Sequence, residues 1–127
     1  MIAFMGHGSD ELEIPVYDML NSEFEHNIHC GFRVGTVESV PGIKPVLDYV
    51  CQNKPAKVLL TPLLVVAGDH AVNDMAGGEN TSWKNILSAE GSEVECLVKG
   101  LGEYSEIRRL YTEHAASADI LEVKNGK

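Results

Sequence analysis

Two histidines and one glutamate recur along this 127-residue chain at nearly equal intervals. His7, Glu38 and His70 are separated by 31 and 32 residues, and each follows a short apolar stretch. Imidazole nitrogens and a carboxylate oxygen suit a divalent first-row metal such as cobalt, nickel, iron or zinc, and three such ligands leave further coordination positions open. Imidazole also accepts protons at physiological pH, so His7 and His70 are candidate bases as well as candidate ligands.

Each of these three residues has a simpler explanation when it is taken alone. A histidine in a glycine-rich loop is often only a turn residue, and a single glutamate at the end of a strand is usually solvated. Their occurrence at matching strand ends, each beside glycine or proline turn residues, favours one shared metal site.

The segment around His70 concentrates polar side chains after an apolar run. Residues 58–66 are almost continuously apolar, which predicts a strand buried on both faces. The run breaks at Gly68, and four residues with ligand or acid/base capacity follow, namely Asp69, His70, Asn73 and Asp74. Open α/β sheets bind ligands at this carboxyl edge. Asp69 and Asp74 are candidates either to orient His70 or to cap the turn after it.

Four apolar stretches alternate with four amphipathic ones, and this rhythm predicts an α/β domain with a parallel sheet and helices on both faces. We take the strand order as 2-1-3-4 by analogy with doubly wound sheets. The expected strands are residues 2–5, 32–37, 58–66 and 94–98, and the expected helices are residues 12 or 15 to 25, 41–53, 80 or 81 to 91, and 104–117. In this order the first three strands are neighbours about 5 Å apart, so His7, Glu38 and His70 should emerge together at one edge.

The helix ends and faces lead to three further expectations. Pro41 suits the first position of the second helix, and Asn80 or Thr81 can cap the third. The last helix carries Ile107, Leu110, Tyr111 and His114 on one side. This spacing predicts an apolar face in which His114 is a packed core residue rather than a ligand.

The composition excludes several classes of protein. The chain has 10 basic and 19 acidic residues and a formal charge of -9, without a basic run, which argues against a nucleic-acid surface. Its three cysteines form no CxxC pair and are typical of reduced thiols. No stretch has the pattern of a secretion signal or a membrane span, and no glycine pattern indicates a dinucleotide fold. We therefore expect one cytoplasmic domain over residues 1–127.

The sequence around these residues resembles the anaerobic cobaltochelatases, class II chelatases that insert Co²⁺ into sirohydrochlorin during cobalamin biosynthesis. The matching stretches are MGHG at 5–8, GTVE at 35–38, PLLVVAGDHAVNDMAG at 62–77, SW at 82–83 and GLGE at 100–103. The resemblance covers essentially the whole chain but only the carboxyl-terminal half of the usual family protein.

The resemblance implies a specific site and reaction. Family members have two similar α/β halves with the tetrapyrrole in the cleft between them, and the carboxyl-terminal half carries two histidines and a glutamate that bind the metal. These positions fall here on His7, Glu38 and His70, and His7 or His70 would be the base that takes the pyrrole protons. The candidates for contact with the tetrapyrrole are Gly8, Asp69, Asn73 and Trp83, and Asp74 is a candidate to support His70 from behind. Trp83 is also a candidate for core packing.

Three hypotheses follow for the function. The first is a homodimeric chelatase with Co²⁺ as substrate, where Ni²⁺, Fe²⁺ and Zn²⁺ are possible alternatives and a second copy supplies the missing wall of the cleft. The second is a metal- or tetrapyrrole-binding half-domain without turnover. The third is an unrelated metalloenzyme that uses the same ligand set for oxygen chemistry on a different fold.

Overall fold

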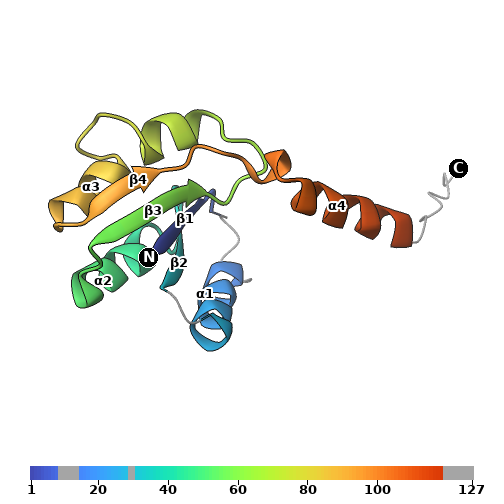
Figure 1. Cartoon of the computed structure of the whole chain (residues 1–127), viewed down its shortest axis with the longest axis horizontal. Helices are drawn as coiled ribbons and strands as arrows, with labels where there is room; N and C mark the ends of the chain where they lie inside the picture. Colours follow the sequence, from blue (N-terminus) through green and yellow to red (C-terminus); the bar gives the residue numbers. More distant parts are fainter. Residues whose placement is uncertain (9–14, 29–30, 119–127) are drawn as a thin grey trace, which may run out of the picture.

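Four short strands form a parallel sheet in the order β2-β1-β3-β4 (Figure 1), as the sequence predicts. The computed structural model describes residues 1–8, 15–28 and 31–118. The strands are β1 (Ile2–Gly6), β2 (Phe32–Thr36), β3 (Lys57–Pro62) and β4 (Glu93–Cys96). The helices are α1 (Val16–Asn27), α2 (Lys44–Asn53), α3 (Trp83–Ala89) and α4 (Ser105–Ser117), with a π-helix at His70–Met75 and a 3-10 turn at Leu101–Glu103.

One face of the sheet forms the hydrophobic core. Side chains alternate along a strand, so Ala3 and Met5 point to the same face, and both are fully buried. They pack with side chains from the other strands, α2, the π-helix and α3, namely Val46, Val50, Val58, Leu60, Ala71, Met75, Trp83 and Leu87. This face is therefore closed by α2, α3 and the π-helix.

The part of the chain that the structure describes covers the opposite face only in part. Phe4 stacks on Phe24 of α1 and on Phe32 of β2, with ring centroids 5.8 and 6.0 Å apart. No residue of α1 is fully buried. Helices thus lie on both faces, as predicted, but the second face has a much thinner cover than the first.

Helix α4 contradicts the prediction of a packed final helix. It has no buried residue, and it projects away from the sheet (Figure 1). Leu110 and Tyr111 are 45% and 61% exposed, and His114 is exposed rather than part of the core. The predicted apolar side exists, but no described part of this chain covers it.

The other differences from the predicted elements lie at their ends. Strand β3 ends at Pro62, and Val65 and Val66 are exposed, because beyond this point the chain leaves the sheet. Helix α2 begins at Lys44 with a proline in its first turn, so Pro41 lies in the preceding turn and does not open the helix.

The start of α3 also differs from the prediction. Its cap is Ser82, whose hydroxyl accepts a hydrogen bond from the Asn85 backbone N–H at 3.3 Å, rather than Asn80 or Thr81. The first predicted helix begins at Val16, and the alternative start at Leu12 lies outside the described residues.

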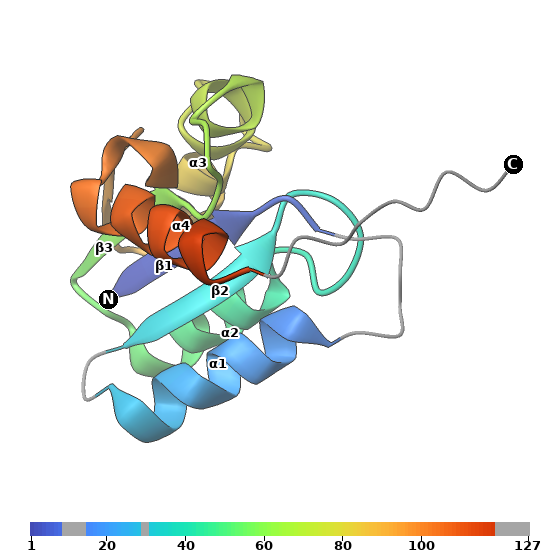
Figure 2. The ribbon, with the colours of Figure 1, turned by 90° about the vertical axis from the view of Figure 1, so that its right-hand side faces the viewer.

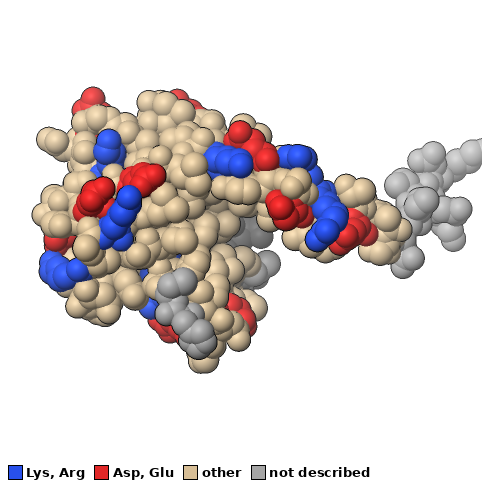
Figure 3. Space-filling view, viewed as in Figure 1, with Lys and Arg blue, Asp and Glu red and all other residues tan. Residues whose placement is uncertain are grey.

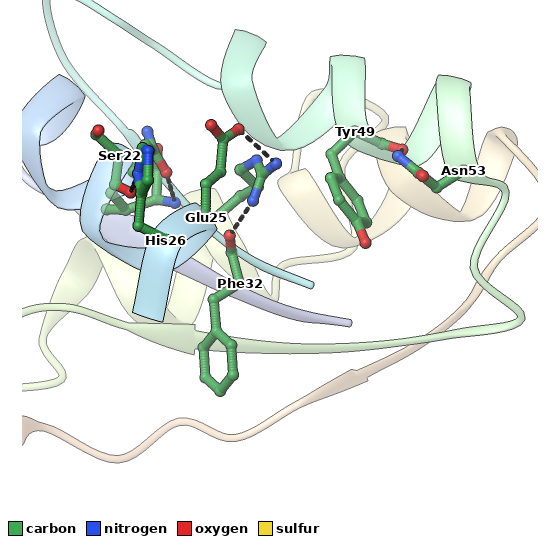
Figure 4. A network of polar contacts seen from close by, with 9 residues as sticks. Ser22, Glu25, His26, Phe32, Tyr49 and Asn53 are labelled. Carbon is green, nitrogen blue, oxygen red and sulfur yellow. Dashed lines mark hydrogen bonds and ion pairs between the residues drawn. The ribbon is translucent and has the colours of Figure 1, made fainter. Parts of the chain in front are cut away.

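The exposed edge of β2 is protected by α1 and α2, which flank it (Figure 2). The Asn21 amide of α1 donates to the Val34 carbonyl at 2.9 Å and accepts from the Val34 N–H at 2.8 Å. The Arg33 guanidinium donates to Glu25 at 2.8 Å and lies 4.5 Å over the Tyr49 ring of α2, and Figure 4 shows both partners. The Asn21 amide thus satisfies the backbone N–H and C=O of Val34, on an edge strand that would otherwise be open to pairing at this residue.

We expect Asn21→Ala to destabilise the domain by about 1–3 kcal/mol, since it leaves two partly buried backbone groups of Val34 without partners. Urea unfolding followed by circular dichroism measures the change. Asn27→Ala is the matched control, because this amide donates only to the exposed Glu23 carboxylate on the same helix. Equal stability of the two variants would show that the bonds to Val34 contribute nothing.

None of the described helices is both long enough and apolar enough to cross a bilayer.

Candidate metal site

The first two ligand candidates lie side by side because parallel pairing continues beyond the ends of β1 and β2. Gly6 is opposite Thr36 in the register of the two strands. Past this point the Val37 N–H donates to the Gly6 carbonyl and the Glu38 N–H donates to the His7 carbonyl, both at 2.9 Å. Backbone hydrogen bonds therefore hold His7 and Glu38 side by side.

This close pairing requires a glycine at position 8. Gly8 has φ of +105°, and a Cβ atom there would lie 2.0 Å from the Glu38 carbonyl oxygen. Its N–H donates to the Tyr17 hydroxyl at 3.2 Å, which ties the turn after His7 to α1. Sequence reasoning missed Tyr17, since nothing local links a tyrosine in a helix to a turn nine residues earlier. The predicted contact of Gly8 with substrate stays a prediction.

The third candidate, His70, is the first residue of the π-helix that follows β3. Ala71 and Met75 of this short helix are fully buried in the core, so the helix is fixed on the sheet. His70 and Asp74 lie four residues apart on it and are partly exposed. Single π-helical turns are frequent at functional sites.

The three side chains converge at the carboxyl edge of the sheet. Ligand atoms of His7, Glu38 and His70 all lie within 4.8 Å of one another. The His7 Nε2 atom is 3.9 Å from one oxygen of Glu38, and the His70 Nε2 atom is 3.8 Å from the other. The two imidazole rings meet edge to face, with centroids 5.2 Å apart and an interplanar angle of 77°.

This donor set suits a small divalent ion. Metal–ligand bonds of about 2.0–2.2 Å separate two ligands of one ion by at most about 4.4 Å, so slight side-chain rotations would close the three groups on it. The side chains of His7, Glu38 and His70 are 55%, 57% and 32% exposed, so all three are open to solvent. The site is thus accessible from outside the domain.

Asp74 orients His70 from the side opposite the proposed ion. Its carboxylate lies 2.6 Å from the His70 Nδ1 atom. The pKa of His70 is raised, first by this hydrogen bond and further by the charges of Asp74, Glu38 and Asp69, while burial opposes the change. With the Nδ1 proton donated to Asp74, the Nε2 lone pair of neutral His70 faces Glu38 and is available to a metal.

The remaining candidates are divided between this site and the core. Asp69 accepts a hydrogen bond from the Asn73 amide at 2.6 Å, and both are exposed residues at the π-helix that carries His70. Trp83 is only 5% exposed and belongs to the core. Its burial agrees with the packing role that the sequence also allowed, and its predicted contact with the tetrapyrrole stays a prediction.

We expect Asp74→Asn to weaken Co²⁺ binding by about tenfold, as the loss of a charged partner behind a metal-binding histidine typically does. Protons compete with the metal for His70, so binding falls as the pH decreases through the raised pKa of this residue. The variant removes the main cause of the raised pKa of His70. The midpoint of its pH profile for Co²⁺ binding should therefore move to lower pH. Calorimetric titration with Co²⁺ across pH measures both effects.

The matched control for this variant is Asp69→Asn. Asp69 acts on His70 only through its charge and makes no hydrogen bond to it, so its replacement should move the midpoint much less. Equal shifts of the midpoint in the two variants would mean that the negative charges around His70, rather than its hydrogen bond with Asp74, raise the pKa of this residue.

The domain is an open α/β sheet with three ligand-capable side chains at its carboxyl edge, and the comparison with a family model identifies it as a chelatase-type domain. A solved structure of a cobalamin (vitamin B12) biosynthesis CbiX protein from Marinobacter aquaeolei VT8 has the same fold, with a TM-score of 0.64 and 16% identity over 92% of this chain and 98% of that one. The family model for cobalt chelatase (CbiK) matches residues 1–120. The chain belongs to this family.

Two curated relatives agree with this assignment. The sirohydrochlorin cobaltochelatase of Salmonella typhimurium strain LT2 is 36% identical over 117 residues, which are 92% of this chain and 44% of that protein. The sirohydrochlorin cobaltochelatase CbiKC of Nitratidesulfovibrio vulgaris strain Hildenborough is 30% identical over 92% of this chain and 41% of that protein. The chain therefore spans less than half the length of these relatives, and its match to their carboxyl-terminal half stays a prediction.

Proposed function

We propose that this chain inserts Co²⁺ into sirohydrochlorin, and that it does so as a homodimer. The observation that supports the proposal most directly is the convergence of His7, Glu38 and His70 within 4.8 Å at the carboxyl edge of the sheet. The relatives named above are sirohydrochlorin cobaltochelatases. Membership of their family also removes the hypothesis of an unrelated metalloenzyme on a different fold.

In the proposed reaction the three side chains take Co²⁺ from water and present it to one face of the macrocycle. Insertion replaces two pyrrole N–H bonds by bonds to the metal, so two protons must leave. As the ion moves to the macrocycle it releases the lone pairs of its protein ligands, which can then accept these protons. His70 is the favoured first acceptor, because the hydrogen bond from its ring to Asp74 raises its pKa.

In this proposal the second copy of a homodimer closes the cleft that a single copy leaves open. The metal ligands are open to solvent, and the chain spans less than half the length of its curated relatives. A second copy related by a two-fold axis would provide the other wall of a closed cleft. Ni²⁺, Fe²⁺ and Zn²⁺ fit the same donor set, so metal preference has to be measured.

A second candidate function is a metal- or tetrapyrrole-binding half-domain without turnover. The exposure of His7 and Glu38, both above half, favours it, because an open site binds an ion but does not exclude water from a bound macrocycle.

One experiment separates these two functions. The absorbance of sirohydrochlorin is followed with Co²⁺ and this protein under anaerobic conditions, against a control without protein, and the mass of the protein is recorded on the same sample by light scattering. A dimer that accelerates the spectral change supports the chelatase. A protein that binds Co²⁺ without accelerating insertion is the half-domain without turnover.

A further inference from the structure

Glu38 lies in a loop that returns to the strand from which it leaves. The loop spans residues 37–41, between the end of β2 and the turn before α2. Its first two residues are held by β1, because the Val37 N–H donates to Gly6 and the Glu38 N–H donates to His7. The position of the Glu38 carboxylate therefore depends on what holds the other end of the loop.

Thr36, the last residue of β2, holds that other end by two hydrogen bonds to Gly42. The Thr36 N–H donates to the Gly42 carbonyl, and the Gly42 N–H donates to the Thr36 hydroxyl, both at 2.9 Å. Thr36 is 1% exposed, so its hydroxyl is shielded from water. A partly buried N–H that loses its partner is costly, so the hydroxyl matters as well as the backbone. We refer to these two bonds as the Thr36 clamp.

The returning end of the loop packs directly on β2. A Cβ atom at Gly35 would lie 2.4 Å from the Gly42 carbonyl oxygen and 2.9 Å from Cη2 of the Trp83 ring. Gly35 thus leaves the space in which the Gly42 peptide and the Trp83 ring approach the strand. The buried ring of Trp83 therefore lies behind the clamped end of the loop.

The backbone inside the loop is strained. Ser39, directly after Glu38, has φ of +57°, a region that residues other than glycine rarely adopt. Such a conformation persists where the surrounding contacts determine it, and it is frequent at functional sites. The Thr36 clamp is one of the contacts that hold the residue after Glu38 in this conformation.

The Thr36 side chain also lies against the turn that follows His7. A Cβ atom at Gly8 would be 3.4 Å from the Thr36 Cβ atom. Thr36 is therefore in contact with the turns that carry two of the three candidate ligands, although its own hydroxyl bonds to Gly42 rather than to a ligand.

We propose that Thr36 is a positioning residue of the metal site, which places the Glu38 carboxylate by fixing the return of its loop. Glu38 is the group that faces both histidines, with one oxygen 3.9 Å from His7 and the other 3.8 Å from His70. Displacement of this loop would separate the carboxylate from both imidazoles at once. Loss of the Thr36 hydroxyl should therefore weaken metal binding without removing any ligand.

This role of Thr36 rests on the metal site of the proposed function, but it does not depend on turnover. A protein that binds Co²⁺ through this site and does not insert it would contradict only the proposed function. A chelatase whose Thr36→Val variant binds Co²⁺ as tightly as the wild-type protein would contradict only the role of Thr36.

The first test compares the Co²⁺ affinities of two variants with that of the wild-type protein by calorimetry. Thr36→Val replaces the hydroxyl by a methyl group, which cannot accept from the Gly42 N–H. It should lower the affinity by about tenfold, as the loss of a group that supports a metal ligand typically does. Thr36→Ser keeps the hydroxyl and should bind Co²⁺ nearly as tightly as the wild-type protein.

Ser92→Ala is the matched control. Ser92 is 6% exposed, and its hydroxyl donates to the Pro55 carbonyl at 2.7 Å before the start of β4, at the opposite edge of the sheet from the metal site. Its replacement removes a buried hydroxyl that bonds to the backbone, as Thr36→Val does, and should leave the Co²⁺ affinity unchanged. Wild-type affinity in Thr36→Val, an equal loss in Thr36→Ser, or an equal loss in Ser92→Ala would overturn the proposal.

Charge does not account for the expected differences. The chain has a formal charge of -9, which attracts any cation, and Figure 3 shows acidic and basic side chains interspersed on the face in view. None of the three substitutions changes this charge. Differences in affinity among these variants therefore report the geometry of the site.

The second test determines whether Thr36 acts through Glu38. Thr36→Val is combined with Glu38→Ala, and the affinities of the four proteins of this cycle are measured with Cu²⁺, the divalent ion that a given set of ligands binds most tightly. Thr36→Val should weaken binding in the wild-type background and cause no further loss in the Glu38→Ala background, because the carboxylate that it positions is absent there. The same loss in both backgrounds would mean that Thr36 supports the domain in general, and would overturn the proposal.

Circular dichroism shows whether each variant is folded. If Thr36→Val does not fold, Thr36→Ala takes its place in both tests, because it removes the same hydroxyl without adding a methyl group beside the Gly42 N–H. The same losses are expected of it, and wild-type affinity in this variant would equally overturn the role of Thr36.

Discussion

Replacing His70 with alanine is expected to lower the rate of Co²⁺ insertion by at least about 100-fold while the domain stays folded. The substitution removes one of three ligands, which a metal site rarely tolerates, and also the favoured proton acceptor. The fold should persist, because His70 is 32% exposed and its π-helix is anchored by Ala71 and Met75. Sirohydrochlorin absorbance gives the rate, and calorimetry with Co²⁺ alone gives the metal affinity.

His26→Ala is the matched control for this substitution. His26 is an exposed histidine near the end of α1, and its ring contacts only the Ser22 carbonyl among the bonds described, at 2.7 Å. The His26→Ala variant should insert Co²⁺ at the wild-type rate. An active His70→Ala variant would remove His70 from the proposed mechanism, and a globally unfolded one would show that the residue is structural.

Gly8→Ala is expected to have the second largest effect, because it acts on two ligands at once. A Cβ atom at position 8 would lie 2.0 Å from the Glu38 carbonyl oxygen, at a φ of +105° that other residues rarely adopt. The backbone pairing between His7 and Glu38 must then open. We expect Co²⁺ affinity to fall by about tenfold or more and stability to fall by about 1–3 kcal/mol, measured by calorimetry and urea unfolding.

Gly78→Ala is the matched control, because its added Cβ would have no atom within 4 Å. The Gly78→Ala variant should have nearly the Co²⁺ affinity and the stability of the wild-type protein. If Gly8→Ala bound Co²⁺ like the wild-type protein, the close approach of the two turns would not be needed to form the site.

The location of the candidate site could be predicted from regular patterns, whereas the sheet order was taken by analogy with doubly wound sheets. The apolar stretches mark the strands, right-handed crossovers restrict their order, and parallel strands end at one edge. His7, Glu38 and His70 could therefore be assigned to a common region before their distances were known. Strand β3 was predicted too long, because apolar residues continue into the exposed turn at Val65 and Val66.

The geometry of the site depends on contacts between distant parts of the chain. The sequence does not reveal that Gly8 lies against Glu38, that the Tyr17 hydroxyl accepts from Gly8, or that a π-helix carries His70. Asp74 was a candidate to orient His70, and only the folded chain brings its carboxylate to 2.6 Å from the ring. These features lie beyond the strand ends, where no periodic pattern specifies the backbone.

The final helix shows most clearly which features the sequence determines and which depend on the tertiary structure. By itself the sequence determined that α4 is amphipathic, since the spacing of Ile107, Leu110 and Tyr111 places them on one side. Only the tertiary structure decided that this side is not buried in its own chain, because the bonded turn at Gly100–Glu103 directs the helix away from the sheet. Periodicity specifies which side of a helix is apolar, whereas the surface that covers it depends on where the whole chain directs the helix.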